Sequence, residues 1–99
     1  MIYYVYMLVC ISSVKKRTYV GYTNDIENRL KNHNSNKGAK YTKGNRWKII
    51  YKKRFLSKSK AMAYEYILKH DRKERLKIFN NYKWIFQFYF LIRKTIPKK

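Results

Sequence analysis

Apolar runs and a polar turn predict a β-hairpin at the start of the chain. Residues 2–10 hold no Gly or Pro and are dense in Tyr and Val, which is typical of a buried or half-buried strand. Residues 12–16 are a polar turn, and residues 18–20 form a second strand that we expect to end at Gly21. Side chains of the first strand alternate, with Tyr4, Tyr6, Leu8 and Cys10 on one face and Tyr3, Val5, Met7 and Val9 on the other.

Helical spacing replaces the strand pattern after the hairpin. Ile26, Leu30 and His33 follow a cluster of capping residues at 23–25, so we expect a helix over residues 25–34.

A long loop then leads to a third strand. The loop covers residues 34–45, and the strand covers residues 47–55. Strict alternation would place Ile49 and Tyr51 on one face of this strand and Ile50 on the other.

Two more helices are predicted downstream of the third strand. Ser57 or Ser59 caps the first of them, and the second starts at Asp71. The side chains that we expect to face inward are Ala61, Tyr64 and Leu68 on the first helix, and Leu76 and Phe79 on the second.

This order of elements, ββα-β-αα, predicts an α+β fold in which helices flank a three-stranded antiparallel sheet, as a small sandwich. The 99 residues leave room for one core, which we place in a domain over residues 1–79. Residues 80–99 form an aromatic and basic extension, whose pattern fits a strand and a helix equally well.

Cysteine and hydropathy patterns restrict the class of protein. A single cysteine excludes a disulfide framework and a cysteine-based zinc site, and it fits a reducing compartment. No apolar run reaches the roughly 18 residues of a membrane span, and residues 1–4 lack the basic segment of a secretion signal. We therefore expect a cytoplasmic protein with no membrane partner.

The charge is strongly positive, with 25 Lys and Arg against 5 Asp and Glu and a formal net charge of +20. A compact body this basic attracts polyanions, and nucleic acid is the favoured partner. Base composition and lipid binding stay open as alternatives. Lys, Asn, Ile and Tyr all use A/T-rich codons, so base composition accounts for part of the lysine excess, and a basic surface also suits anionic lipid.

The acidic residues are informative because they are few. Asp25 and Glu27 fall in the first turn of one predicted helix, and Asp71 and Glu74 form a capping box at the start of another. Glu65 remains in the middle of a helix with no capping role. This carboxylate is a candidate ligand for a hard metal ion.

Four further side chains are predicted to lie near one another. Arg29 and His33 are four residues apart on one helix and share a face. Tyr6 and Tyr19 lie on adjacent antiparallel strands, where cross-strand neighbours approach within about 5 Å. With Glu65, these groups would supply a phenol, an imidazole, a cation for phosphate and a metal ligand, the parts that phosphodiester hydrolysis needs.

Five elements follow one another at suitable spacing in the chain. They are Tyr4-Val5-Tyr6, Tyr19-Val20-Gly21, Arg29, His33 and Glu65. In this order they resemble the GIY-YIG nucleases, and in particular the small stand-alone bacterial members. The resemblance covers about residues 2–79, with a tyrosine in place of the first glycine of the family pattern.

The resemblance implies a role for each of these side chains. Tyr6 would be the general base that activates the attacking water, and Tyr19 would support it or orient the water. Arg29 would hold the scissile phosphate, while His33 would assist proton transfer or contact the phosphate. Glu65 would bind one divalent metal ion, Mg²⁺ or, as a substitute, Mn²⁺.

A basic loop beside these elements is a candidate surface for DNA. Its residues are Lys40, Tyr41, Lys43 and Arg46. They would follow the backbone of a strand, with Tyr41 as a stacking platform, although an ordinary solvated surface accounts for them as well. Because no base-reading motif is visible, we expect binding that is structure-selective or only weakly sequence-selective.

The sequence thus predicts a metal-dependent endonuclease that hydrolyses DNA in repair or processing. Specificity would come from a partner protein or from flexible, nicked, branched or single-stranded DNA. A non-catalytic nucleic-acid-binding module on the same fold is the alternative, and charge alone would also fit a structural RNA-binding protein. The pattern does not indicate an oligomeric state.

Overall fold

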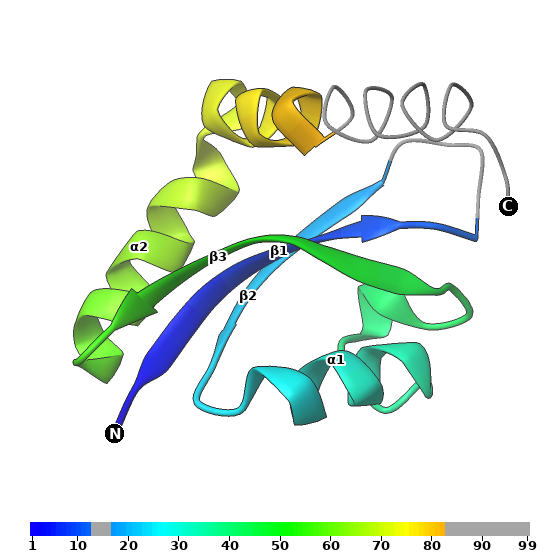
Figure 1. The fold of residues 1–99 in the computed structure, drawn as a ribbon, viewed down its shortest axis with the longest axis horizontal. Helices are drawn as coiled ribbons and strands as arrows, with labels where there is room; N and C mark the ends of the chain where they lie inside the picture. Colours follow the sequence, from blue (N-terminus) through cyan, green and yellow to red (C-terminus); the bar gives the residue numbers. More distant parts are fainter. Residues whose placement is uncertain (13–16, 83–99) are drawn as a thin grey trace, which may run out of the picture.

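A single antiparallel sheet forms the centre of the protein (Figure 1). The computed structural model describes residues 1–12 and 17–82. Its strands are β1 (Tyr3–Cys10), β2 (Thr18–Thr23) and β3 (Trp47–Phe55), arranged in the order β2-β1-β3. The predicted three-stranded antiparallel sheet is therefore confirmed, with β1 in the centre and with β2 and β3 as its edge strands.

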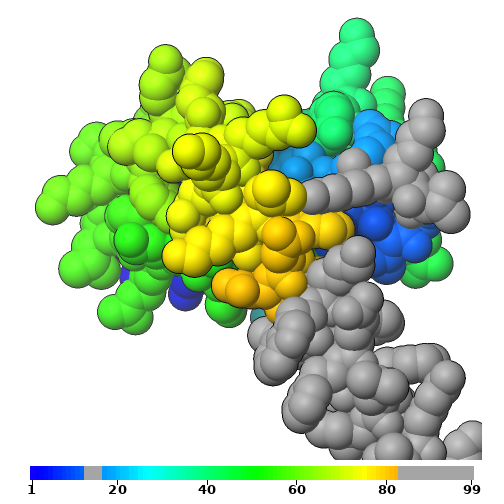
Figure 2. Space-filling view, turned by 90° about the horizontal axis from the view of Figure 1, so that it is seen from above, coloured from blue at the N-terminus to red at the C-terminus, as the bar shows by residue number. Residues whose placement is uncertain are grey.

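Helices cover both faces of this sheet. The helix α1 (Ile26–Asn34) and a short 3₁₀ helix (Lys40–Thr42) lie on one side, whereas α2 (Lys58–His70) lies on the other (Figure 1). A last helix, residues 72–82, continues the layer of α2. Figure 2 shows the side chains of α2 and the last helix covering this face of the sheet. The order of elements matches the α+β sandwich expected from the sequence.

The starts of the helices are fixed by the predicted capping residues. In each case a side-chain oxygen accepts a hydrogen bond from the backbone N–H three residues later, which satisfies a group that has no partner inside the helix. The caps are Asp25, Ser57 and Asp71. Ser57 rather than Ser59 therefore starts α2.

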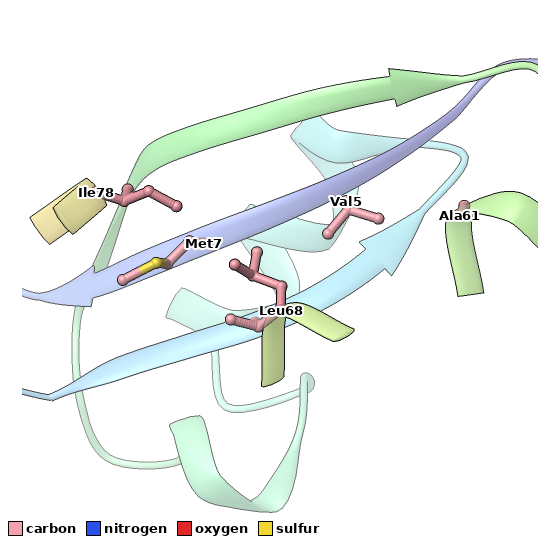
Figure 3. Packing of buried hydrophobic residues seen from close by; sticks show 6 residues of the cluster. Val5, Met7, Ala61, Leu68 and Ile78 are labelled. Atoms are coloured by element: carbon pink, nitrogen blue, oxygen red, sulfur yellow. The ribbon is translucent and has the colours of Figure 1, made fainter. Parts of the chain in front are cut away.

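Burial on both faces of β1 divides the interior into two cores. The α2-side core consists of Val5, Met7, Val20, Ala61, Leu68 and Ile78 (Figure 3). The α1-side core consists of Tyr6, Leu8, Cys10 and Trp47, with Ile26 and Leu30 of α1 packed against it. The predicted alternation of side chains along β1 is confirmed, because odd and even positions enter different cores.

Two predictions of inward-facing residues are wrong. Leu76 is 43% exposed, and Ile78 fills the α2-side core instead. On β3, Tyr51 pairs with Met7 and Ile49 pairs with Leu8, so the pairing with β1 skips Ile50. Ile50 is the extra residue of a β-bulge. Ile50 and Tyr51 therefore pack on the α2 side and Ile49 on the α1 side, which strict alternation did not anticipate.

The end of β2 also differs from the prediction. The strand continues through Gly21 to Thr23, so Gly21 lies within the sheet, directly opposite Tyr6 of β1. This register brings the backbone of β2 close to the Tyr6 ring.

Within residues 1–12 and 17–82, the helices are too short or too polar to cross a lipid bilayer. The predicted extension over residues 80–99 falls partly in the last helix, which includes residues 80–82. The aromatic segment from residue 83 onward, for which strand and helix were both open, lies outside the described residues.

Candidate active site

The phenol of Tyr6 is the centre of a buried polar cluster. Tyr6 points from β1 into the α1-side core and is 1% exposed. Its Oη lies 2.8 Å from Nε2 of His33 and accepts a hydrogen bond of 3.3 Å from Nε of Arg29. Helical spacing places Arg29 and His33 on the same face of α1, as predicted. The structure thus brings these three residues together.

The 3₁₀ helix fixes the tautomer of His33. Nδ1 of His33 lies 2.8 Å from Oγ1 of Thr42, and Thr42 donates its hydroxyl proton to the carbonyl oxygen of Ala39 at 2.8 Å. A hydroxyl has one proton, so Oγ1 must accept from Nδ1–H of His33. In the neutral ring Nε2 is then an acceptor, and it receives the proton of the Tyr6 hydroxyl.

Burial keeps both members of the Tyr6–His33 pair neutral. It raises the pKa of Tyr6 to about 12, although the hydrogen bond and charge of Arg29 partly oppose this effect. Burial also lowers the pKa of His33 to about 4, and the positive charge of Arg29 adds to this shift. The resting site therefore holds a neutral phenol that donates to a neutral imidazole, consistent with the tautomer deduced from Thr42.

Two glycines allow the cluster to pack so closely. A Cβ on Gly21 would lie 2.5 Å from Oη and 2.7 Å from Cζ of Tyr6, and a Cβ on Gly38 would lie 2.5 Å from Nδ1 of His33. Distances this short are steric overlaps, so only glycine fits at either position. The sequence prediction gave Gly21 the role of ending β2, but the space for the Tyr6 ring is what requires it.

Tyr19 is a diagonal neighbour of Tyr6 rather than its direct partner. Across the β1–β2 ladder, Tyr6 faces Gly21 and Tyr19 faces Leu8. The ring centre of Tyr19 lies 6.4 Å from that of Tyr6 and 5.0 Å from that of His33. The two phenols are therefore diagonal neighbours on adjacent strands, and Tyr19 borders the cluster.

Glu65 lies in the other layer of helices, and its charge acts on Tyr6. It belongs to α2, which covers the face opposite to Tyr6 but also packs along the edge strand β2. Its charge is one of the smaller causes that raise the pKa of Tyr6, after burial. Its Oε1 forms an ion pair of 3.0 Å with Nζ of Lys69.

Glu65 is the carboxylate whose charge acts on Tyr6, which makes it the candidate ligand for a metal ion. No group of three or more His, Cys, Asp or Glu side chains comes together as a metal site in residues 1–12 and 17–82. Mg²⁺ usually keeps several waters and takes one or two carboxylates, so one glutamate suits it better than it suits Zn²⁺. The side chain of Glu65 is 16% exposed, which leaves it accessible once Lys69 moves away.

The predicted DNA-binding residues form an exposed surface beside the cluster. Lys40, Tyr41 and Lys43 lie in or next to the 3₁₀ helix, and Arg46 precedes β3. Tyr41 is 48% exposed and stacks on Tyr19, with ring centres 6.2 Å apart. Tyr41 is therefore the member of this set that the structure connects to the cluster.

The sequence analysis missed three residues that shape the site. Thr42 accepts a hydrogen bond from His33, and Gly38 leaves room for the His33 ring. Arg17 lies 4.7 Å from the centre of the Tyr41 ring and donates to the Tyr41 carbonyl oxygen at 3.3 Å. A threonine, a glycine and an arginine in loops carry no periodic signal, so only the three-dimensional contacts reveal them.

Comparisons with known proteins identify the family of this chain. The model of the family described as the GIY-YIG catalytic domain matches residues 2–89. The UPF0213 protein OB0043 of Oceanobacillus iheyensis is 45% identical over 78 residues, which cover 77% of this chain and 87% of that protein. The UPF0213 protein SH2523 of Staphylococcus haemolyticus is 42% identical over 78 residues, covering 77% of this chain and 92% of that protein.

A solved structure is also similar. The solution NMR structure of the UPF0213 protein BH0048 from Bacillus halodurans has 39% sequence identity and a TM-score of 0.49. The match covers 81% of this chain and 84% of that one.

Proposed function

The chain belongs to the GIY-YIG catalytic domain family, and we propose that it is a metal-dependent endonuclease that hydrolyses DNA phosphodiester bonds. The observation that carries this proposal is the oriented hydrogen-bond chain from Tyr6 through His33 to Thr42, with Arg29 beside it. A buried chain of this kind is a path for one proton, which a purely structural core does not need.

Tyr6 would pass on the proton of the attacking water rather than hold a permanent negative charge. With a pKa of about 12 for the phenol and about 4 for the imidazole, no proton moves from Tyr6 to His33 at rest. When a water molecule attacks phosphorus, Oη accepts the water proton while its own proton passes to Nε2 of His33. The new O–P bond forms as the bond to the leaving oxygen breaks, and the leaving oxygen departs with the electrons of that bond.

Binding of the substrate would make this transfer easier. The positive charge of Arg29 is one cause of the low pKa of His33, after burial. A phosphate bound to Arg29 would offset that charge, so the pKa of His33 would rise when the substrate is present. Arg29 uses Nε to bind Tyr6, and terminal N–H groups of its guanidinium would contact the phosphate.

Glu65 would hold the metal ion, for which we propose Mg²⁺, with Mn²⁺ as a substitute. When bound, the ion would supply positive charge for the phosphate oxygens and the leaving group. Lys69 would have to give up its ion pair with Glu65 as the metal binds. Tyr19 would border the water and support Tyr6, whose ring lies 6.4 Å away.

The substrates that we propose are flexible, nicked, branched or single-stranded DNA in repair or processing within the cytoplasm. The exposed residues Lys40, Lys43 and Arg46 would add contacts to phosphates that carry no base information. A partner protein would supply any further specificity. The net charge of +20 supports a polyanionic substrate.

Cleavage assays on duplex, nicked, branched and single-stranded DNA with Mg²⁺ test this function. We expect Arg29→Ala and Glu65→Gln to abolish cutting, and Glu65→Gln to keep most of the binding. Glu27→Gln is the matched control, because Glu27 is an exposed carboxylate in the first turn of α1. If both site variants cut at the parental rate, the assignment is wrong. Binding without cleavage by the parental protein under any divalent metal would favour the non-catalytic nucleic-acid-binding module instead.

A further inference from the structure

Two pockets of the described residues lie along the outer edge of β2, one near each end of the strand. The pocket at the start of β2 has a volume of about 360 Å³ and is lined by Thr18, Tyr19, Val20, Tyr41, Lys69 and Arg75. The pocket at the end of β2 has a volume of about 300 Å³ and is lined by Tyr3, Tyr22, Thr23, Asn24, Arg29 and Lys58. Each pocket contains residues from the sheet and from α2, so both open at the edge where the two helical layers meet.

The candidate active site lies between the two pockets. Tyr19 lines the first pocket and Arg29 lines the second, and both border the Tyr6 phenol. Lys58 and Lys69 stand near opposite ends of α2, about 16 Å apart at a rise of 1.5 Å per residue. A chain that entered both pockets would therefore pass Tyr6 about halfway along its path.

Each pocket carries two cations, which suits phosphate groups. In the first pocket, Nη1 of Arg75 donates to the carbonyl oxygens of Leu68 and Lys69 at the end of α2. These bonds fix the guanidinium and leave its Nε and Nη2 donors for a ligand. Lys69 stands beside it with a side chain that is 45% exposed. In the second pocket the cations are Arg29 and Lys58.

Aromatic side chains add a second kind of contact in the first pocket. Tyr41 stacks on Tyr19, and the guanidinium of Arg17 lies over the Tyr41 ring. A layered set of aromatic rings and a guanidinium is a surface on which an unpaired base can stack. Pockets of about 300 to 360 Å³ lie at the small end of ligand sites. They suit single nucleotides rather than base pairs.

Building on the proposed nuclease function, we propose that one unpaired DNA strand runs along the outer edge of β2. Its phosphates on the two sides of the cleaved bond lie in the two pockets, one at Lys69 and Arg75 and the other at Lys58. This path makes the enzyme selective for single-stranded segments, such as flaps, gaps and the arms of branched DNA.

Binding measured without divalent metal tests the path independently of cleavage. Fluorescence anisotropy of a labelled single-stranded oligonucleotide compares Arg75→Gln and Lys58→Gln with the parental protein. We expect each variant to bind about tenfold more weakly, as for the loss of a charge-assisted hydrogen bond. The matched controls are Arg72→Gln and Lys60→Gln, which remove exposed cations of the same helices outside both pockets. These controls should bind within about twofold of the parent.

A neutral phosphate makes the test specific. A methylphosphonate placed next to the cleaved bond should weaken binding to the parental protein, but it should add no further loss in one of the two pocket variants. Arg75 also bonds the carbonyl oxygens at the end of α2, so its loss could lower stability as well as binding. Thermal unfolding measures the stability of each variant, and Arg75→Lys keeps the positive charge. A folded Arg75→Lys protein should still bind better than Arg75→Gln.

The outcomes separate the path from the function. Equal losses in pocket and control variants, or equal losses for duplex and single-stranded DNA, would overturn the path. A protein that shows the expected pocket pattern but never cleaves would overturn the nuclease function and leave the path in place.

Discussion

The hydroxyl of Tyr6 lies 2.8 Å from Nε2 of His33, although 27 residues separate them in the chain. Both side chains are buried. The hydrogen bond between Thr42 and the other ring nitrogen of His33 fixes the direction of the Tyr6–His33 hydrogen bond. The proton of the phenol therefore points at Nε2, which is unprotonated and accepts it with its lone pair. The chemistry of the site consequently depends on single protons at named atoms, each of which a substitution can remove or redirect.

Removal of the Tyr6 hydroxyl should stop cleavage with little effect on DNA binding. Tyr6→Phe deletes the group that we propose relays the water proton, and general acid–base steps contribute about 100- to 10,000-fold. We expect the single-turnover cleavage rate to fall within or beyond this range. Tyr64→Phe is the matched control, since Tyr64 forms a similar hydroxyl bond of 2.8 Å, to Tyr51, on the far side of the sheet. That variant should lose about 1 kcal/mol of stability and keep its cleavage rate.

Loss of the Thr42 hydroxyl should release the tautomer of His33. In Thr42→Val, the buried Nδ1 loses its acceptor, which costs about 1–3 kcal/mol of stability. The ring can then place its proton on Nε2, where it opposes donation from Tyr6, so the cleavage rate should fall at least about tenfold. Nitrogen chemical shifts of the imidazole report the tautomer directly. Thr42→Ser keeps the hydroxyl and should restore both readouts; a parental rate in a folded Thr42→Val would contradict the role given to this bond.

The unfolding free energy should decrease as the pH falls, because His33 is buried in its neutral form. Its pKa is lowered from the ordinary 6.5 to about 4. Below pH 6.5 the unfolded chain therefore binds more protons at His33 than the folded one does. The contribution is complete above pH 6.5, and on the order of 3 kcal/mol is lost by about pH 4.

Urea unfolding at several pH values measures this effect against His33→Gln, which cannot titrate. The difference in stability between the two proteins should narrow between about pH 6.5 and pH 4. A difference that stays constant with pH would show that His33 is not held neutral.

Sequence patterns predicted the elements well because local periodicity determines them. The β1 alternation and the caps Asp25, Ser57 and Asp71 are confirmed because each depends on a few neighbouring residues. The faces of β3 were predicted wrongly because the bulge at Ile50 is a property of the pairing with β1, and no signal in the strand itself reveals it.

The candidate site was predictable only in part, for a similar reason. Tyr6, Arg29 and His33 carry residue types and spacings that indicate hydrolytic chemistry, and the structure brings them together. Thr42 lies in the 3₁₀ helix, whose approach to α1 depends on tertiary contacts, including the bond from Trp47 Nε1 to the Thr42 carbonyl oxygen. Its role therefore follows only from the folded geometry.

Gly21→Ala should damage the site through the Tyr6 ring. The added Cβ would lie 2.5 Å from Oη and 2.7 Å from Cζ of Tyr6, and Tyr6 is too buried to move away freely. Overpacking of this kind typically costs about 1–3 kcal/mol, and displacement of Oη from His33 should also slow cleavage. Thermal and urea unfolding measure the first effect, and single-turnover cleavage measures the second.

The matched test repeats the exchange in a Tyr6→Leu background, where no ring occupies the space above Gly21. If the clash with Tyr6 is the cause, Gly21→Ala should cost much less stability there. An equal cost in both backgrounds would show that the backbone of β2, and not the phenol of Tyr6, requires glycine at this position.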